Sequence, residues 1–356
     1  MPQPSGSCVR PPVILSLCGV RAPLDPSNAD VDVVGIGNAL VDVLSHESEE
    51  FIDSLGVSKG AMTLIDEERA GEIYDLTGPA VEISGGSAAN TMVGVAAMGG
   101  RAEYLGKVRD DQLGHVFAHD IRATGVTYEV PLAAAGPATG CCLILVTPDA
   151  QRTMNTYLGA SVHLGPDDVD EHRIARASVL YLEGYLFDPP EAQEAFRVAA
   201  RYAHEAGRVV SATLSDGFCV ERHHDAFLDL VENHVDLLFA NEAEILALYG
   251  TDDFDVALSR VREHVEVAAL TRSAKGSVVA TADRVIEIPA EPIDELVDTT
   301  GAGDLYASGF LHGFSRGADL QDCGRLGSLA ASEVISHLGA RPEGDLAAQS
   351  AAVLGG

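Results

Sequence analysis

One segment of the sequence combines residue types that bind an anion and take up a proton, and it reads Asp298-Thr299-Thr300-Gly301-Ala302-Gly303-Asp304. Its glycines let backbone N–H groups approach a ligand closely. Because an apolar run follows from Leu305, the segment predicts the N-terminus of a helix, where partial positive charge attracts anions. Asp304 would then face the anion and accept a proton from an attacking hydroxyl group, which suits phosphoryl transfer. The simpler alternative is that Asp304 only caps the helix.

A second segment, Gly85-Gly86-Ser87-Ala88-Ala89-Asn90, lies more than 200 residues earlier in the chain. Gly85 and Gly86 permit close approach of the backbone to a ligand, and Ser87 is a residue type that begins helices. Asn90, one turn further on, offers both a donor and an acceptor to a sugar hydroxyl group. Alone, the segment is also compatible with an ordinary helix start. Beside the first segment, it predicts a substrate site next to an anion site.

Together, the two segments resemble the signatures of the ribokinase-like (PfkB) family of carbohydrate and nucleoside kinases, which are a GG-[S/N]-x-x-N helix start and a D-T-x-G-A-G-D anion hole. The resemblance extends from about Val31 to Ala340. It implies ATP as co-substrate and Mg²⁺ as cofactor, with Asp304 as the catalytic base. It also implies that the backbone of Gly301, Ala302 and Gly303 holds the phosphoryl group in transfer.

The same resemblance implies residues for the nucleotide and the metal. Asn241 and Glu244 match the family's N-x-x-E element, which organises magnesium through water, as suits a hydrated hard cation; a capped acidic helix start is the alternative. Arg152 lies where several nucleoside kinases place a cation near the transferred phosphates, and an exposed turn arginine is the alternative reading. The nucleotide side would further include Thr271, Arg272, Gly276 and Thr299, although Arg272 could equally be a solvated charge.

The segment Gly37-Asn38-Ala39-Leu40-Val41-Asp42 bears on the substrate. In the family an Asp at this place binds two vicinal sugar hydroxyls, a task that suits a carboxylate, so the resemblance assigns Asn38 and Asp42 to substrate binding. The segment is more similar to adenosine kinases than to ribokinases or fructokinases, which implies phosphorylation of the adenosine 5′-hydroxyl. The alternatives are another purine nucleoside (inosine or guanosine), a free sugar (ribose or fructose), or a non-catalytic ligand-binding protein of the same fold. Tyr185 is a candidate contact for the base, although an aromatic residue after a strand can also belong to the core.

Composition and missing motifs exclude several other functions. A net charge of −31 at pH 7 argues against a nucleic-acid partner, because no broad basic face remains for a phosphate backbone. No apolar run approaches the ~18 residues of a membrane-spanning helix. There is no G-x-x-x-x-G-K-[S/T] phosphate loop, and the third glycine of a dinucleotide-binding G-x-G-x-x-G is replaced by Leu40. The six cysteines show no C-x-x-C pair, so we expect a reducing, cytoplasmic location.

The apolar pattern predicts an α/β fold, with a doubly wound, mostly parallel sheet flanked by helices and a small β-sheet lid. Strands at 179–182, 209–213, 237–239 and 267–270 alternate with helices near 191–206, 221–232, 242–249 and 253–264. Earlier strands, drawn from about 38–66 and 100–147, are left over to form the lid. We expect one kinase domain over residues 30–345, between a disordered tail at 1–29 and a C-terminal tail at 346–356, in a monomer or a homodimer.

Overall fold

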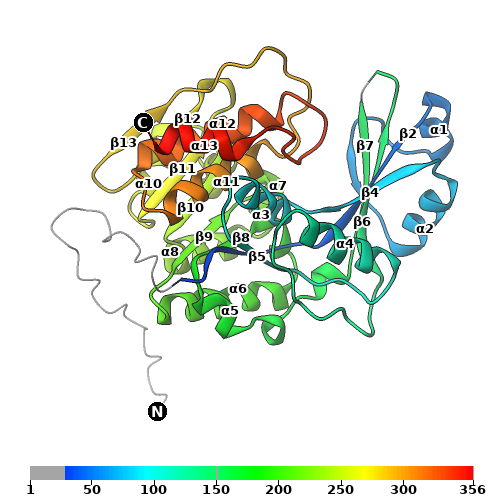
Figure 1. Ribbon diagram of the computed structural model, residues 1–356, viewed down its shortest axis with the longest axis horizontal. Helices are drawn as coiled ribbons and strands as arrows, with labels where there is room; N and C mark the ends of the chain where they lie inside the picture. The colour runs from blue at the N-terminus through cyan, green and yellow to red at the C-terminus, as the bar shows by residue number, and fades with distance from the viewer. Residues whose placement is uncertain (1–28, 150, 356) are drawn as a thin grey trace.

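The computed structural model describes residues 29–149 and 151–355. Figure 1 shows a large body of helices packed around one sheet, and beside it a smaller body built on a second sheet. The expected tail at 1–29 falls, except for Ala29, outside the described residues. Among the residues described, no helix is long and apolar enough to cross a membrane.

The large sheet has eight strands in the order β13-β12-β11-β10-β9-β8-β1-β5. The six strands from β11 to β5 are parallel to one another, and β12 and β13 extend the sheet antiparallel. The strands are β1 (Val31–Ile36), β5 (Ala102–Leu105), β8 (Ala177–Glu183), β9 (Val209–Thr213), β10 (Leu237–Asn241), β11 (Val267–Thr271), β12 (Ser277–Ala280) and β13 (Val285–Ile288). The chain places β5 on one side of β1 and β8 on the other, so the strand order reverses at β1. Doubly wound sheets bind ligands beyond the carboxyl ends of their strands at such a reversal.

Helices cover both faces of this sheet, which confirms the doubly wound prediction. On one face, α3 (Ser87–Ala97) and α11 (Ala302–Ser315) share a core with Val33 and Tyr181. On the other face, α6 (Pro190–Glu205) shares a core with Val34 and Leu180. Neighbouring residues of β1 and β8 thus enter opposite cores, which is why residues 33–36 and 179–182 of these strands are continuous apolar runs. The other helices of this body are α5 (Glu171–Ala175), α7 (Gly217–Arg222), α8 (His224–His234), α9 (Glu242–Tyr249), α10 (Phe254–Val261), α12 (Leu320–Val334) and α13 (Leu346–Leu354).

The small sheet, here called the lid, has five strands in the order β3-β7-β6-β2-β4. Helices α1 (Glu49–Leu55) and α2 (Glu67–Leu76) contribute Ile52 and Ile73 to its core, and α4 (Gln112–Ala123) contacts its strands β2, β4 and β6. The lid strands are β2 (Leu40–His46), β3 (Met62–Leu64), β4 (Ala80–Gly85), β6 (Thr139–Val146) and β7 (Arg152–Gly159).

The lid boundaries expected from the sequence are wrong in part. Strands β4 and β7 lie outside 38–66 and 100–147, whereas β5 lies inside the second range and pairs with β1 in the large sheet. An apolar strand pattern predicts that a segment is buried, but it does not specify the partner with which the strand forms hydrogen bonds.

Two helical regions also differ from the expectation. The C-terminal residues form α13 instead of a tail, because Asp345 caps the helix by accepting a bond from the Ala348 N–H (2.9 Å) and Leu346 is buried against α12. The single helix expected at 221–232 is divided between α7 and α8. The break falls at His223, whose φ of −120° and ψ of 32° lie outside the helical region.

Candidate active site

The structure brings the two predicted motifs together around Asp304. This residue lies in the first turn of α11, and its Oδ1 accepts a hydrogen bond from Ser87 Oγ (2.6 Å) while its Oδ2 accepts one from Asn90 Nδ2 (3.0 Å). The other polar atom of the Asn90 side chain, Oδ1, is buried and has no partner among the described residues. Buried acceptors are nearly always paired in proteins, so this oxygen points to a missing donor, such as a ligand hydroxyl.

The environment of Asp304 makes it a stronger base than an ordinary aspartate. Burial raises the pKa of its carboxyl group, while the hydrogen bonds from Ser87 and Asn90 and the positive charge of Arg341 oppose that rise. A carboxylate whose pKa lies closer to neutrality is better matched to accept a proton from a hydroxyl group.

The anion loop that precedes Asp304 has the backbone that its glycines predict. Gly301 is the N-cap of α11, with a φ of 79°, a conformation that L side chains rarely adopt. A Cβ at this position would also lie 2.8 Å from Cα of Ala340, so the loop after α12 packs directly on it. The Ala302 N–H donates to the Thr299 carbonyl oxygen (3.2 Å). The N–H groups that follow it in the first turn, next to Asp304, have no partner within the helix, as an anion site requires.

Asp42 reaches the site from the lid. It lies in β2, opposite Ile83 of β4 and Cys142 of β6. A Cβ on Gly85 would lie 2.5 Å from the Asp42 carboxylate oxygens, so only glycine leaves room for them. Burial raises the pKa of Asp42 to about 6, against the positive charges of Arg341 and Arg152 and together with the negative charge of Asp304. Asp42 and Asp304 therefore interact electrostatically with each other and with Arg341, and these three side chains are here called one electrostatic unit.

Gly86 is required for the turn that carries the substrate motif, and we expect G86A to destabilise the protein by about 3 kcal/mol. Its φ is 102°, and a Cβ would overlap the carbonyl oxygen of Asn38. Thermal unfolding should show the loss. Gly71 of α2 is the matched control, because a Cβ there meets nothing and G71A should raise stability slightly. Equal melting temperatures for the two variants would contradict the assignment.

Sequence reasoning missed Glu183, which supports both ends of the substrate site. It is buried at the carboxyl end of β8, where its Oε1 accepts bonds from the Asn38 N–H (3.1 Å) and Nδ2 (2.9 Å), and its Oε2 accepts one from the Ala88 N–H (2.7 Å). The Asn38 Oδ1 accepts a bond from Ser161 Oγ (2.9 Å). Both polar atoms of Asn38 are thus engaged inside the protein, and its contact with substrate stays a prediction. Burial raises the pKa of Glu183 to about 7.

Arg152 connects the lid to the anion loop. Its Nη1 lies 2.7 Å from Oδ2 of Asp298, the first residue of the anion motif, and both side chains are about nine-tenths buried. Asp298 also accepts bonds from the N–H groups of Thr300 (2.9 Å) and Gly339 (3.0 Å). The guanidinium therefore lies beside the anion loop, where a cation near a phosphate is expected, whereas Thr299 is exposed.

The residues predicted for the nucleotide lie at the ends of β10 and β11. Asn241 and Thr271 are paired in register, and Gly276, with a φ of 86°, follows in the turn before β12. Asn241 and Glu244 form a reciprocal capping box at the start of α9. Arg272 is not a free cation, because it donates to Glu242 Oε1 (2.8 Å) and stacks on the Phe254 ring with its Cζ 3.9 Å from the centroid.

Tyr185 lies in the helical turn Gly184–Phe187 that follows β8. Its side chain is 39% exposed, and its pKa is raised by burial and by the charges of Asp216, Asp304 and Glu244. No hydrogen bond of its hydroxyl group to the residues predicted for the substrate or for the nucleotide is found among the described residues. Its contact with a base therefore stays a prediction.

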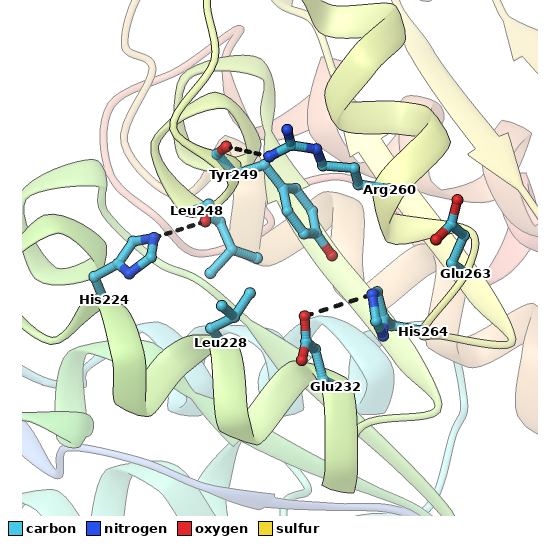
Figure 2. A pocket seen from close by; sticks show the side chains of 8 residues that line it. All are labelled: His224, Leu228, Glu232, Leu248, Tyr249, Arg260, Glu263 and His264. Atoms are coloured by element: carbon cyan, nitrogen blue, oxygen red, sulfur yellow. Dashed lines mark hydrogen bonds and ion pairs between the residues drawn. The ribbon is translucent and has the colours of Figure 1, made fainter.

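A hollow of about 350 Å³ lies between α8, the C-terminal end of α9, and α10, and Figure 2 shows the side chains that line it. Those side chains largely bond to one another or to nearby carbonyl groups. His264 Nε2 lies 3.4 Å from Glu232 Oε1, and Arg260 Nη1 donates to the Tyr249 carbonyl oxygen (2.7 Å). None of the predicted site residues lines this hollow.

Asp304 lies in the first turn of a helix, beside the anion loop, and the lid brings Asp42 to the same site. This arrangement suits a phosphotransferase for small molecules. The chain belongs to the pfkB family of carbohydrate kinases, which it matches over residues 55–345.

Solved structures and curated relatives agree with this assignment. A probable sugar kinase from Rhizobium etli is 50% identical over 92% of this chain and 99% of its own, with a TM-score of 0.83. The adenosine kinase from Sinorhizobium meliloti is also 50% identical, over 90% of this chain and 99% of its own, with a TM-score of 0.83. The adenosine kinase of Saccharomyces cerevisiae is 26% identical over 86% of this chain and 95% of its own. The protein is therefore an ATP-dependent kinase that acts on a sugar or a nucleoside.

Proposed function

We propose that the protein transfers the γ-phosphoryl group of ATP to the 5′-hydroxyl of adenosine, giving AMP and ADP. The observation that carries this proposal is the joining of Ser87, Asn90 and Asp304 by hydrogen bonds, with Asp42 in the same electrostatic unit. This arrangement offers a base for one hydroxyl and acceptors for others. Adenosine is favoured because one 50% identical structure is an adenosine kinase. A free sugar is the second candidate, because another relative of equal identity is a probable sugar kinase.

In this proposal the side chains divide the work between binding and proton transfer. Asp42 and Asn90 accept hydrogen bonds from sugar hydroxyls. Gly85 leaves room for the Asp42 carboxylate, and Gly86 gives the turn before Ser87 and Asn90 its positive φ. Asp304 takes the proton of the attacking hydroxyl, and the N–H groups at the start of α11 receive the negative charge of the phosphoryl group. The lid, tied to the anion loop through Arg152, excludes water that would otherwise hydrolyse ATP.

The residues at the start of α9 fit a magnesium ion held through water. Burial raises the pKa of Glu244 to about 7, and Asp216 adds to the rise, so a cation nearby would favour the ionised form. No group of three or more His, Cys, Asp or Glu side chains suited to holding a metal occurs among the described residues, which disfavours a cage of direct ligands. A hydrated Mg²⁺ keeps most of its waters and needs few protein oxygens. Such an ion would neutralise phosphate charge, and Asn241 and Glu244 would orient its water.

The test is a comparison of kcat/KM for ATP turnover with Mg²⁺ and each of five acceptors: adenosine, inosine, guanosine, ribose and fructose. We expect adenosine to lead by about a hundredfold, the discrimination available to a site that pairs with several groups of one substrate. A reaction without acceptor measures background hydrolysis. If a free sugar leads, adenosine is the wrong substrate and the kinase assignment stands. If no acceptor stimulates turnover, the proposed reaction is wrong for all five, and binding without catalysis becomes the better description.

A further inference from the structure

Arg341 lies in the loop after α12, outside both motifs, yet its guanidinium reaches the turn between β4 and α3. Its Nη2 donates to the carbonyl oxygen and to Oγ (3.1 Å) of Ser84, and its Nη1 donates to the Ala89 carbonyl oxygen (3.4 Å). Ser84 in turn donates from its N–H (2.7 Å) and its Oγ (2.6 Å) to Asp120 of α4. These contacts lie on either side of the Gly85–Ser87 turn. Arg341 therefore holds the substrate turn at both of its ends.

The residues just before Arg341 contact the anion loop. Ala340 is the neighbour that leaves no room for a Cβ at Gly301, and the Gly339 N–H donates to Asp298. Three consecutive residues, 339–341, thus touch the anion loop and the substrate turn at once. These two motifs lie more than 200 residues apart in the chain.

The charge around Arg341 explains why an arginine can lie there. Burial lowers its pKa, and the negative charges of Asp42, Asp120 and Asp304, with Tyr104, oppose that fall. In return, the positive charge of Arg341 opposes the rise in pKa that burial causes at Asp42 and at Asp304. Two acids in one partly buried site would otherwise repel each other.

We propose that Arg341 is a positioning residue of the phosphoryl-transfer site, which fastens the substrate turn to the anion loop and serves Asp42 and Asp304 as a shared counter-cation. It acts through these groups, without itself taking part in proton transfer. The inference rests on the proposed function, because it assigns Asp42 to substrate and Asp304 to the hydroxyl proton. Other titratable groups from the surrounding elements interact electrostatically with Asp42, Asp304 or Arg341. They are Tyr104 of β5, Asp120 of α4, Cys141 and Cys142 of β6, Arg152 of β7, Tyr181 and Glu183 of β8, and Tyr185 after β8.

The first measurement is the pH dependence of kcat/KM for R341Q, R341K and the wild type, with the best acceptor of the five. Without the guanidinium charge, the pKa values of Asp42 and Asp304 rise, so both acids stay protonated to higher pH. The kcat/KM of R341Q should therefore fall about 100-fold below wild type at pH 6, and about 10-fold or less at pH 8.5, where both acids are ionised again. R341K keeps the charge and loses the fork of donors, so it should lose activity equally at both pH values. R325M removes an exposed arginine of α12 that pairs with Asp322, and it should leave the pH profile unchanged.

The second measurement is thermal unfolding at pH 5 and pH 8, which needs no turnover. The folded pKa of Asp42 and Asp304 lies above the unfolded value, so the stability linked to their protonated forms is lost as the pH rises. Because R341Q raises both pKa values further, its deficit in melting temperature should be larger at pH 8 than at pH 5. If R341Q folds at pH 5 and is unfolded at pH 8, that result also supports the role of Arg341 as counter-cation.

The outcomes separate this inference from the proposed function. A wild type that is inactive with every acceptor would overturn the proposed reaction, and the unfolding data would still decide whether Arg341 is the counter-cation. The wild type could instead be active while the pH profile of R341Q runs parallel to it and the deficit in melting temperature is the same at both pH values. That result would overturn the role of Arg341 and leave the proposed function standing.

Discussion

D304N should fold normally and lose about 10³-fold in kcat, because a general base typically contributes 10² to 10⁴-fold. Asparagine has the same shape as aspartate and can keep both hydrogen bonds of this site. Its oxygen can accept from Asn90 Nδ2, and its amide can donate to Ser87 Oγ, whose hydroxyl is free to rotate. The substitution therefore removes the basic lone pairs and the negative charge of Asp304, and it keeps the shape and the hydrogen bonds of the side chain. Binding of adenosine, measured by calorimetry, should change by less than about tenfold, since the lost interaction operates in the transition state.

A matched control separates proton transfer from helix capping. Asp322 occupies the first turn of α12, as Asp304 does in α11, and it pairs with Arg325 at the surface. If first-turn charge were all that mattered, D322N and D304N would have similar effects on stability and turnover. We expect D322N to retain wild-type kcat. A D304N enzyme within about tenfold of wild-type turnover would remove Asp304 from the role of base.

The architecture was predictable wherever burial leaves an unambiguous pattern. The runs at 209–213 and 267–270 were expected as strands, and β9 and β11 cover them with at most one added residue. These strands are largely buried on both faces, so apolar residues dominate them. The one polar residue inside the run at 209–212, Ser211, is buried and donates to the Leu180 carbonyl oxygen (2.8 Å). The Gly-rich motif before Asp304 was equally informative, because α11 begins right after Gly301.

Other parts of the fold left no local signal that could be interpreted. β2 lies within the range from which lid strands were expected, but its neighbour β4 does not, and the place of β4 in the lid depends on its pairing with β2. The antiparallel strands β12 and β13 were not expected, since each has only four residues and so gives too short a run for a clear pattern. The sheet to which a strand belongs depends on the strands with which it pairs, and these pairings cannot be inferred from the order of strands along the chain.

Two site residues show different limits of sequence reasoning. Glu183 ends the apolar strand β8, and a carboxylate at the carboxyl end of a strand next to the reversal of strand order was a usable signal. Arg341 had no such signal. Its partners Ser84 and Ala89 are 257 and 252 residues away in the chain, and no motif surrounds it. Its role follows only from the three-dimensional contacts.

The second large effect is expected at Asp42, where D42N should raise the KM for adenosine about 100-fold and change kcat by less than about tenfold. A hydrogen bond to an ionised carboxylate is worth about 1.5–3 kcal/mol. The amide loses one of the two bonds and makes the other with an uncharged oxygen, so the total loss is about 3 kcal/mol, or about 100-fold in binding. Because the pKa of Asp42 is about 6, the wild-type KM should rise as the pH falls through 6, when the carboxylate becomes protonated. In D42N this dependence should disappear. Initial rates with varied adenosine from pH 5 to pH 8 measure both effects.

The same shift predicts that D42N stabilises the unliganded protein at neutral pH. The pKa is raised from 3.8 to about 6, so the favourable contribution of the protonated form is complete below 3.8 and is lost as the pH rises through 6. Two units correspond to about 3 kcal/mol, and partial exposure of the carboxylate reduces the gain to about 1–2 kcal/mol. Melting temperatures of D42N and wild type should therefore agree near pH 4 and diverge in favour of D42N at pH 8. D75N, at an exposed position of α2, should show no such divergence. If D42N is less stable than wild type at pH 8, the Asp42 carboxylate stabilises the lid. The prediction that its charge destabilises the unliganded protein would then be wrong.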